Sequence, residues 1–292
     1  MEKRAKITQE MIDLYDEYTH VTLDRRGFME KLAKLAGGAA AATVIAPMIA
    51  SNYARAQMVA ADDPRLTVEE ITYPGPAGDV KGYLAIPADA AGPLPGVVVI
   101  HENRGLNPHI QDVVRRVALE GFVALGPDLL SRMGGTPPSD DEAAAMFREL
   151  DRDGVVPDAV AAIPDLRDHA ATNGNVGAVG FCFGGGIVNE MAVNSPDLLA
   201  AVPYYGAQPP AGDVARINAR VMAHYGGLDE RIGAGIADVE AALQANGVDF
   251  QIVVYDGANH AFNNDTSEAR YHKEAAELAW SRTIAFLKET LA

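Results

Sequence analysis

The feature that most constrains the fold of this chain is a continuous β-branched run, Gly96-Val97-Val98-Val99-Ile100. A strand with one solvated face alternates apolar and polar residues, whereas this run contains no polar residue. The run therefore predicts a strand that is buried on both faces. Such strands belong to parallel sheets covered by helices on each side.

The chain beyond residue 57 repeats this theme, because strand-like segments alternate with segments of helical periodicity. Strands are expected at 122–125, 176–181, 200–204, 219–224 and 250–255. Helices are expected at 110–120, 141–150, 159–171, 234–245 and 268–291. One more helix is expected to follow the strand at 176–181 and to extend through residue 193. Two further β-like runs, 68–73 and 80–86, flank a Pro- and Gly-rich turn and predict an antiparallel hairpin. The predicted fold class is α/β, with a mostly parallel sheet, in one domain at 57–292.

Residues 1–56 have the features of an export signal. The pair Arg25-Arg26 precedes an apolar stretch, 32–50, and Ala54-Arg55-Ala56 offers a small-residue cleavage site. This order resembles a leader of the twin-arginine type, whose partner is the export machinery. We expect cleavage near Ala56 and a location in the bacterial periplasm. The alternative is an uncleaved membrane anchor, because the stretch approaches the length of a bilayer span.

The charge and the cysteine content exclude some classes of function. With 24 Lys and Arg against 40 Asp and Glu, the net charge is −16, which disfavours nucleic acid as a partner. The only cysteine, Cys182, rules out an intramolecular disulfide and a cysteine-rich zinc site. No metal or organic cofactor is predicted, and nothing in the sequence indicates an oligomeric state.

Cys182 stands in the segment Gly180-Phe181-Cys182-Phe183-Gly184-Gly185-Gly186, between an expected strand and an expected helix. This is the pattern of a nucleophile elbow, with cysteine in the usual place of serine. The turn is so tight that a side chain two residues before or after the nucleophile would strike its neighbours. The helix N-terminus favours a thiolate, and the N–H of Phe183 would form half of an oxyanion hole. The alternative is a Gly-rich packing or phosphate turn, although no Lys-Ser/Thr follows as in a P-loop.

Two later loops offer an acid and a base for Cys182. Asp229 follows the strand expected at 219–224, and His260 follows the strand expected at 250–255. Taken singly, Asp229 could be a turn former and His260 a surface or helix-capping residue. However, nucleophile, acid and base occur in the order that α/β-hydrolases use, each after a successive strand. We therefore predict a triad of Cys182, Asp229 and His260.

A fourth loop, His101-Glu102-Asn103-Arg104, follows the strand that usually precedes the second oxyanion-hole donor. Glu102 is unusual there for a plain esterase. Beside a thiol, its carboxylate would oppose thiolate formation and could accept the S–H hydrogen bond. The alternative is a structural salt bridge between Glu102 and Arg104.

At these residues the chain resembles the dienelactone hydrolase family, the carboxymethylenebutenolidases, over roughly 73–287. The motifs that carry the resemblance are the cysteine elbow, His101-Glu102-Asn103 with Gly105 and Asn107, Pro127 to Arg132, Tyr204-Tyr205-Gly206, and the Asp229 and His260 loops. The resemblance implies Cys182 as nucleophile, His260 as base and Asp229 as its orienting acid. It also implies that Glu102 holds the resting thiol and that Asn103 N–H joins Phe183 N–H in the oxyanion hole.

The resemblance also bears on the substrate. In the family two arginines bind a substrate carboxylate; Arg132 matches the first, but Asn264 stands where the second is expected. Tyr204 and Tyr205 are further expected substrate contacts. The predicted activity is hydrolysis of a small ester or lactone through a thioester. A general carboxylesterase of neutral esters, which Asn264 favours, and a non-catalytic binding protein on the same scaffold are the alternatives.

Overall fold

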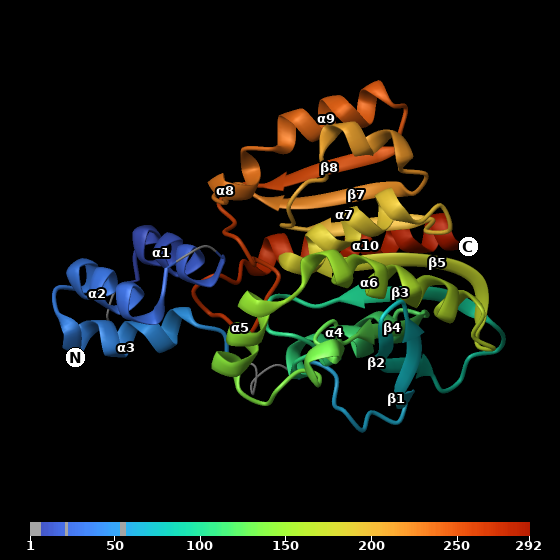
Figure 1. Cartoon of the computed structure of the whole chain (residues 1–292), viewed down its shortest axis with the longest axis horizontal. Coiled ribbons are helices and arrows are strands. Elements are labelled where there is room, and N and C mark those ends of the chain that lie inside the picture. The colour runs from blue at the N-terminus through green and yellow to red at the C-terminus, as the bar shows by residue number, and fades with distance from the viewer. Residues whose placement is uncertain (1–6, 21–22, 53–56) are drawn as a thin grey trace.

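The computed structural model describes residues 7–20, 23–52 and 57–292 (Figure 1). Its centre is an eight-stranded sheet with the order β1-β2-β4-β3-β5-β6-β7-β8. The strands are β1 (Leu66–Gly75), β2 (Gly78–Pro87), β3 (Leu94–Ile100), β4 (Val123–Pro127), β5 (Thr172–Phe181), β6 (Ala200–Tyr204), β7 (Arg220–Gly226) and β8 (Phe250–Tyr255). The α/β-hydrolase architecture predicted from the sequence is confirmed.

The direction of the strands agrees with the prediction. β1 and β2 form the expected antiparallel hairpin, with Tyr73 opposite Val80, and β2 pairs antiparallel with β4. All other neighbours, from β4 through β8, pair in parallel. The carboxyl ends of β3, β5, β7 and β8 consequently open on the same edge of the sheet, where α/β proteins place their ligand sites.

Helices cover both faces of the sheet. They are α4 (Pro108–Leu119), α5 (Asp140–Glu149), α6 (Arg152–Arg167), α7 (Phe183–Asn194), α8 (Glu230–Gly233), α9 (Ile236–Ala245) and α10 (Lys273–Leu291), with 3₁₀ turns at Ser131–Met133 and Ala211–Arg216. Along β3, Val97 and Val99 pack in the core with α4 and α10, whereas Val98 and Ile100 pack in the core with α6, α7 and α9. The apolar run is thus buried on both sides, as its composition predicts.

Helix boundaries differ most from the prediction at the starts of two helices. α6 begins at Arg152 rather than residue 159, because Asp151 caps it and Pro157 is accommodated inside the helix. α10 begins at Lys273 rather than residue 268, because the His272 side chain accepts a hydrogen bond from Ala275 N and caps the helix there. Both caps act through a side chain that the apolar periodicity does not register.

Three helices precede the hydrolase domain: α1 (Gln9–His20), α2 (Arg25–Ala36) and α3 (Ala39–Ile49). They share a small core of their own, to which Met11, Leu14, Phe28, Leu32 and Ile45 contribute. Figure 1 shows them beside the edge of the sheet at which β7 and β8 end. Within the described residues, no single helix is long and apolar enough to cross a membrane; α2 and α3 pass that test only together, and they meet at a bend of 109°.

The N-terminal helices are attached to the hydrolase domain by specific bonds. Asn52 N donates to Thr266 O (2.8 Å), and the Ser267 hydroxyl donates to Ile49 O (2.9 Å). Arg25, the first arginine of the pair, forms an ion pair with Asp141 at 2.6 Å. The expected cleavage site at 54–56 lies outside the described residues, and cleavage there stays a prediction.

Candidate active site

Cys182 sits at a sharp turn between β5 and α7. Its backbone has φ 56° and ψ −114°, a conformation that non-glycine residues rarely adopt and that is typically retained where function requires it. A methyl group added at Gly180 would lie 2.2 Å from Gly184 O, and one added at Gly184 would lie 2.4 Å from Ile100 O. Both contacts are with backbone, so the steric need for glycine at these positions, predicted from the sequence, is confirmed.

Two backbone segments face the elbow. Phe183 is the first residue of α7, so its N–H has no acceptor within the helix. Asn103 lies in the loop after β3, and the fully buried His101 fixes that loop: its Nδ1 lies 2.6 Å from Glu102 O, and its Nε2 accepts from Leu129 N at 3.1 Å. The two predicted oxyanion donors are therefore on rigid parts of the fold.

Asp229 and His260 form a buried pair. His260 Nδ1 lies 2.5 Å from Asp229 Oδ2, while Asp229 Oδ1 accepts from Ile232 N at 3.1 Å and so caps α8. The other ring nitrogen, His260 Nε2, is buried and has no hydrogen-bond partner among the described residues. A ring nitrogen of His260 lies within 4.8 Å of Cys182 Sγ. The structure thus brings together the three residues that the sequence predicts as a triad.

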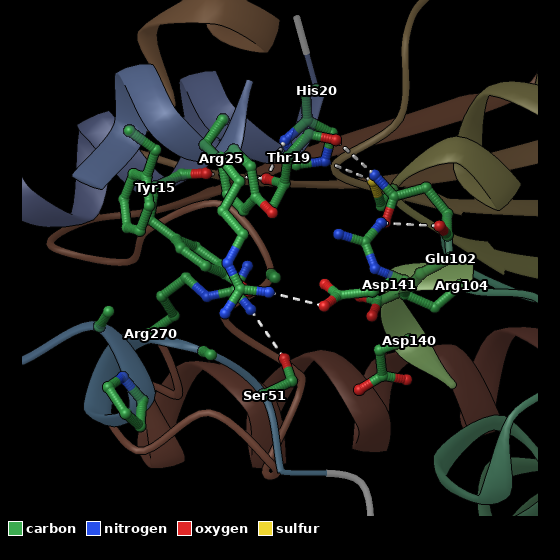
Figure 2. A pocket seen from close by; sticks show the side chains of 18 of the residues that line it. Tyr15, Thr19, His20, Arg25, Ser51, Glu102, Arg104, Asp140, Asp141 and Arg270 are labelled. Atoms are coloured by element: carbon green, nitrogen blue, oxygen red, sulfur yellow. Dashed lines mark hydrogen bonds and ion pairs between the residues drawn. The ribbon is translucent and has the colours of Figure 1, made fainter. Parts of the chain in front are cut away.

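A second histidine, which the sequence analysis did not select, reaches Cys182 from the end of α1. His20, labelled in Figure 2, has its Nε2 2.9 Å from Cys182 Sγ. Its Nδ1 lies 2.9 Å from Asp16 Oδ1. The rings of His20 and His260 meet edge to face with 4.5 Å between their centroids. The nucleophile candidate therefore has an imidazole–carboxylate pair on each of two sides.

The donor atoms of His20, Cys182 and His260 all lie within 4.8 Å of one another. The absence of a metal, expected from the sequence, stays a prediction.

Glu102 is held by a residue outside the predicted site. Its Oε2 accepts from Asn264 Nδ2 at 2.7 Å, and its Oε1 is buried without a hydrogen-bond partner in the part of the chain that the structure describes. Arg104 donates to the carbonyl and the side-chain oxygen of Asn103, not to Glu102. The alternative of a salt bridge between Glu102 and Arg104 is therefore wrong, because the guanidinium of Arg104 hydrogen-bonds to Asn103 instead.

The residues expected to bind substrate fall into different environments. Arg132 forms a bidentate ion pair with the buried carboxylate of Asp158, at 2.5 and 2.7 Å, and lines neither of the two cavities that reach Cys182. Tyr204 is fully buried and shares a hydrogen bond with Thr283 Oγ1 at 2.6 Å. Tyr205 alone of the three lines a cavity beside Cys182. Burial raises the pKa of Tyr205 well above its ordinary value, and the nearby Glu102 adds to this, so its hydroxyl stays neutral.

Two cavities, of about 470 and 790 Å³, meet at Cys182, His20 and His260. In the smaller one, Tyr15 and Arg25 face Glu102 and Arg104 across the space (Figure 2). The larger one is lined by residues of the hydrolase domain and of the N-terminal segment, among them Phe147, Arg148, Arg152, Phe183, Arg231 and Leu23. Both volumes suit a small organic ligand.

The fold and the strained elbow define the class of this protein as an α/β-hydrolase with cysteine at the elbow position. More narrowly, the chain belongs to the dienelactone hydrolase family, whose model matches residues 80–291. Membership of this family supports a hydrolase enzyme and argues against the alternative of a non-catalytic binding protein.

Individual proteins agree with this assignment. A relative from Escherichia coli O157:H7, named "Putative carboxymethylenebutenolidase", is 34% identical over 240 residues, which are 74% of this chain and 84% of the relative. A solved structure named "Putative Dienelactone Hydrolase" from Klebsiella pneumoniae is 31% identical and covers 76% of this chain and 98% of its own, with a TM-score of 0.69. The dienelactone hydrolase-like promiscuous phosphotriesterase P91 from metagenomic libraries is 26% identical, covers 78% of this chain and 100% of its own, and has a TM-score of 0.69.

The N-terminal segment has a match of its own. A family model described as YqhI-like matches residues 1–38, a range that includes Asp16 and His20. The segment that meets Cys182 thus lies outside the part of the chain that the dienelactone hydrolase model matches.

Proposed function

We propose that this protein hydrolyses a small ester or lactone with Cys182 as nucleophile, His260 as general base and Asp229 as the acid that orients it. The observation that carries the proposal is the free nitrogen of the His260–Asp229 pair. Asp229 fixes His260 with its proton on Nδ1, so the unpartnered Nε2 can accept a proton, and the ring has a nitrogen within 4.8 Å of Cys182 Sγ.

The proposed reaction has two steps. The sulfur of Cys182 adds to the substrate carbonyl and expels the alcohol, which leaves an acyl thioester. His260 Nε2 then takes a proton from water, the resulting hydroxide adds to the thioester, and the C–S bond breaks to release the acid. The N–H groups of Phe183 and Asn103 would stabilise the oxyanion in both steps, and Tyr205 would contact the substrate.

The test is acyl-enzyme trapping on the full chain. Wild type and the variants Cys182→Ala and His260→Ala are mixed with p-nitrophenyl acetate and their intact masses are measured. We expect a single added acetyl group in wild type and in His260→Ala, with slow turnover in the latter, and neither label nor turnover in Cys182→Ala. Full esterase activity in Cys182→Ala would refute the proposal.

A neutral ester is the second candidate substrate, and the two positions of the family's arginine pair favour it. Arg132 is bound to Asp158, and Asn264 is fully buried against Glu102, so neither is free for a substrate carboxylate. Comparing kcat/KM for a dienelactone carboxylate and for a neutral aryl ester decides between them. A preference for the dienelactone would assign carboxylate binding to other groups of the cavity.

We further propose that residues 1–56 direct export to the bacterial periplasm. In support, Arg25 and Arg26 both have exposed side chains at the start of α2. Cleaved and tethered forms differ in whether residues 1–56 remain on the exported protein. Fractionation of bacteria that express the full gene, followed by intact-mass measurement, separates the two; recovery of the whole protein in the cytoplasm would refute export.

A further inference from the structure

We propose that His20 and Asp16 of α1 form a second imidazole–carboxylate pair that takes the proton of the Cys182 thiol, so that the N-terminal segment completes the active site. This inference rests on the proposed role of Cys182 as nucleophile, and it applies to the form of the protein that retains residues 1–56, because cleavage near Ala56 would remove both Asp16 and His20. It assigns thiol activation to His20 and leaves His260 for the activation of water.

The contact with Cys182 has the geometry of a proton-transfer pair. His20 Nε2 lies 2.9 Å from Cys182 Sγ, a distance at which the two atoms share a proton. On the other side of the ring, Nδ1 faces both Asp16 Oδ1 (2.9 Å) and Asp16 O (3.0 Å). The backbone oxygen accepts the hydrogen bond and keeps a proton on Nδ1, whereas the carboxylate oxygen makes an ion-pair contact without a hydrogen bond. Nε2 is left to receive the proton from sulfur.

α1 is held in place by each of the loops that carry the proposed triad and oxyanion hole. Arg231, two residues after Asp229, pairs with Asp16 Oδ2 at 3.1 Å. Asn103 Nδ2 donates to Thr19 O at 2.8 Å. Gln9 hydrogen-bonds to Asn259, the neighbour of His260. Three independent loops thus position a single helix end, which is how a preorganised catalytic group is supported.

The surrounding charges favour a protonated His20. Burial and the neighbouring His260 would lower the pKa of His20, but the charge of Cys182 and the hydrogen bond with Asp16 outweigh them, so the pKa is raised. The titratable and charged groups that face this pair are Asp16, Glu102, Tyr205, Asp229, Arg231 and His260. The pKa of Asp16 is lowered although burial opposes this, because His260, His20 and Arg231 surround it, so Asp16 stays ionised.

One oxygen of Glu102 is bonded to another residue, and the other oxygen has no hydrogen-bond partner among the described residues. In the related family a carboxylate at this position is expected to hold the resting thiol. Here Glu102 Oε2 is bonded to Asn264, and the hydrogen bond recorded for Cys182 Sγ goes to His20.

Proton and bond changes balance over the cycle. The thiol proton moves to His20 Nε2; sulfur forms a bond to the carbonyl carbon, the C–O bond of the leaving group breaks, and the alkoxide takes the proton from His20. Water then loses a proton to His260 Nε2, its oxygen adds to the thioester, and the thiolate leaves. The proton on His260 is returned to the departing thiolate, and His20 Nε2 takes it from the sulfur to restore the ion pair.

The docked segment leaves the nucleophile accessible. Cavities of about 470 and 790 Å³ reach Cys182 beside His20, and both also contact His260. His20 therefore forms a wall between two open spaces and does not seal the thiol from substrate.

The experiment measures alkylation of the full chain by iodoacetamide as a function of pH, in the presence of EDTA. Because Cys182 is the only cysteine, the rate reports that thiolate alone. The variants are His20→Gln and Asp16→Asn, with Glu10→Gln as a matched control at an exposed position of the same helix. We expect the alkylation midpoint of both site variants to rise by about one pH unit or more, towards the ordinary thiol value of about 8.5. The control should match wild type.

A kinetic measurement accompanies the alkylation. The acylation burst with p-nitrophenyl acetate should slow by about 10²-fold or more in His20→Gln, in line with the loss of a general base. An unchanged alkylation midpoint in His20→Gln would overturn the inference, and so would faster turnover, which would make the segment an inhibitor. If Cys182→Ala kept its activity, the proposed function itself would fail. If Cys182→Ala is inactive, an unchanged alkylation midpoint or a faster turnover in His20→Gln refutes only the role of His20. Should His20→Gln not fold, as judged by circular dichroism, Asp16→Asn supplies the same readings.

Discussion

Replacing Asp229 by asparagine tests the proposed base through its tautomer. Asp229 Oδ1 accepts from Ile232 N at 3.1 Å, and an asparagine that keeps this bond must turn its NH₂ group towards His260 Nδ1. His260 would then accept at Nδ1 and carry its proton on Nε2, where it could not receive one from water. The flipped amide would restore the tautomer but would leave the buried Ile232 N–H without an acceptor, at a cost of about 1–3 kcal/mol.

The expected loss in kcat is about 10⁴-fold, or about 5 kcal/mol in the barrier, because asparagine also cannot stabilise the imidazolium. The assay is steady-state hydrolysis of p-nitrophenyl acetate, with thermal unfolding as the control for folding. Asparagine is as good a helix cap as aspartate, so α8 should remain in place and the Tm should change little. A loss of less than about 10-fold in a folded variant would refute the assignment of Asp229 and His260 as acid and base.

Three further predictions concern stability. Gly184→Ala should lower the free energy of unfolding by about 1–3 kcal/mol, as overpacking does, because the added methyl group meets backbone atoms. Gly186→Ala in the same helix should be tolerated, because the nearest atom to its added methyl group is 3.6 Å away. Equal urea midpoints for the two variants would contradict the steric reasoning. Arg132→Ala should cost up to about 3–5 kcal/mol by leaving Asp158 buried and unpaired while KM stays unchanged; a large rise in KM without a loss of stability would place Arg132 in the substrate site. Burial, aided by Arg282, lowers the pKa of His224 to about 3, so the unfolded chain binds the extra proton below about pH 6.5, and stability should fall with acid by up to about 1.4 kcal/mol per pH unit. His224→Gln should flatten that slope in urea unfolding between about pH 4.5 and 7.5, and an unaltered slope would show that other groups cause it.

The fold was predictable because its signals are local. The run at β3, the hairpin of β1 and β2 and the bounds of β6 and β8 follow from apolar patterning within a few residues. The elbow was predictable for the same reason, since its glycines and cysteine are contiguous. Asp229 and His260 needed only their order after successive strands, because parallel strands bring such loops to one edge.

The part played by His20 was not predictable in this way. It lies 162 residues before Cys182, in a segment whose composition predicts an export signal, and no spacing rule joins the two. The position of Glu102 shows the same limit, because its partner Asn264 is identified only by tertiary contact. Arg132 matches a family motif in sequence, yet its side chain is held by Asp158, whose proximity no local pattern reveals.

The short helix α8 restricts insertions and deletions in its loop, unlike most surface loops. Its four residues carry the hydrogen bond from Ile232 N to Asp229 and the ion pair from Arg231 to Asp16. Loops of this kind normally tolerate insertions during divergence. One residue inserted between Asp229 and Arg231 would shift the supports of both imidazoles at once, so variation in length here is incompatible with keeping either His260 or His20 in register with the thiol.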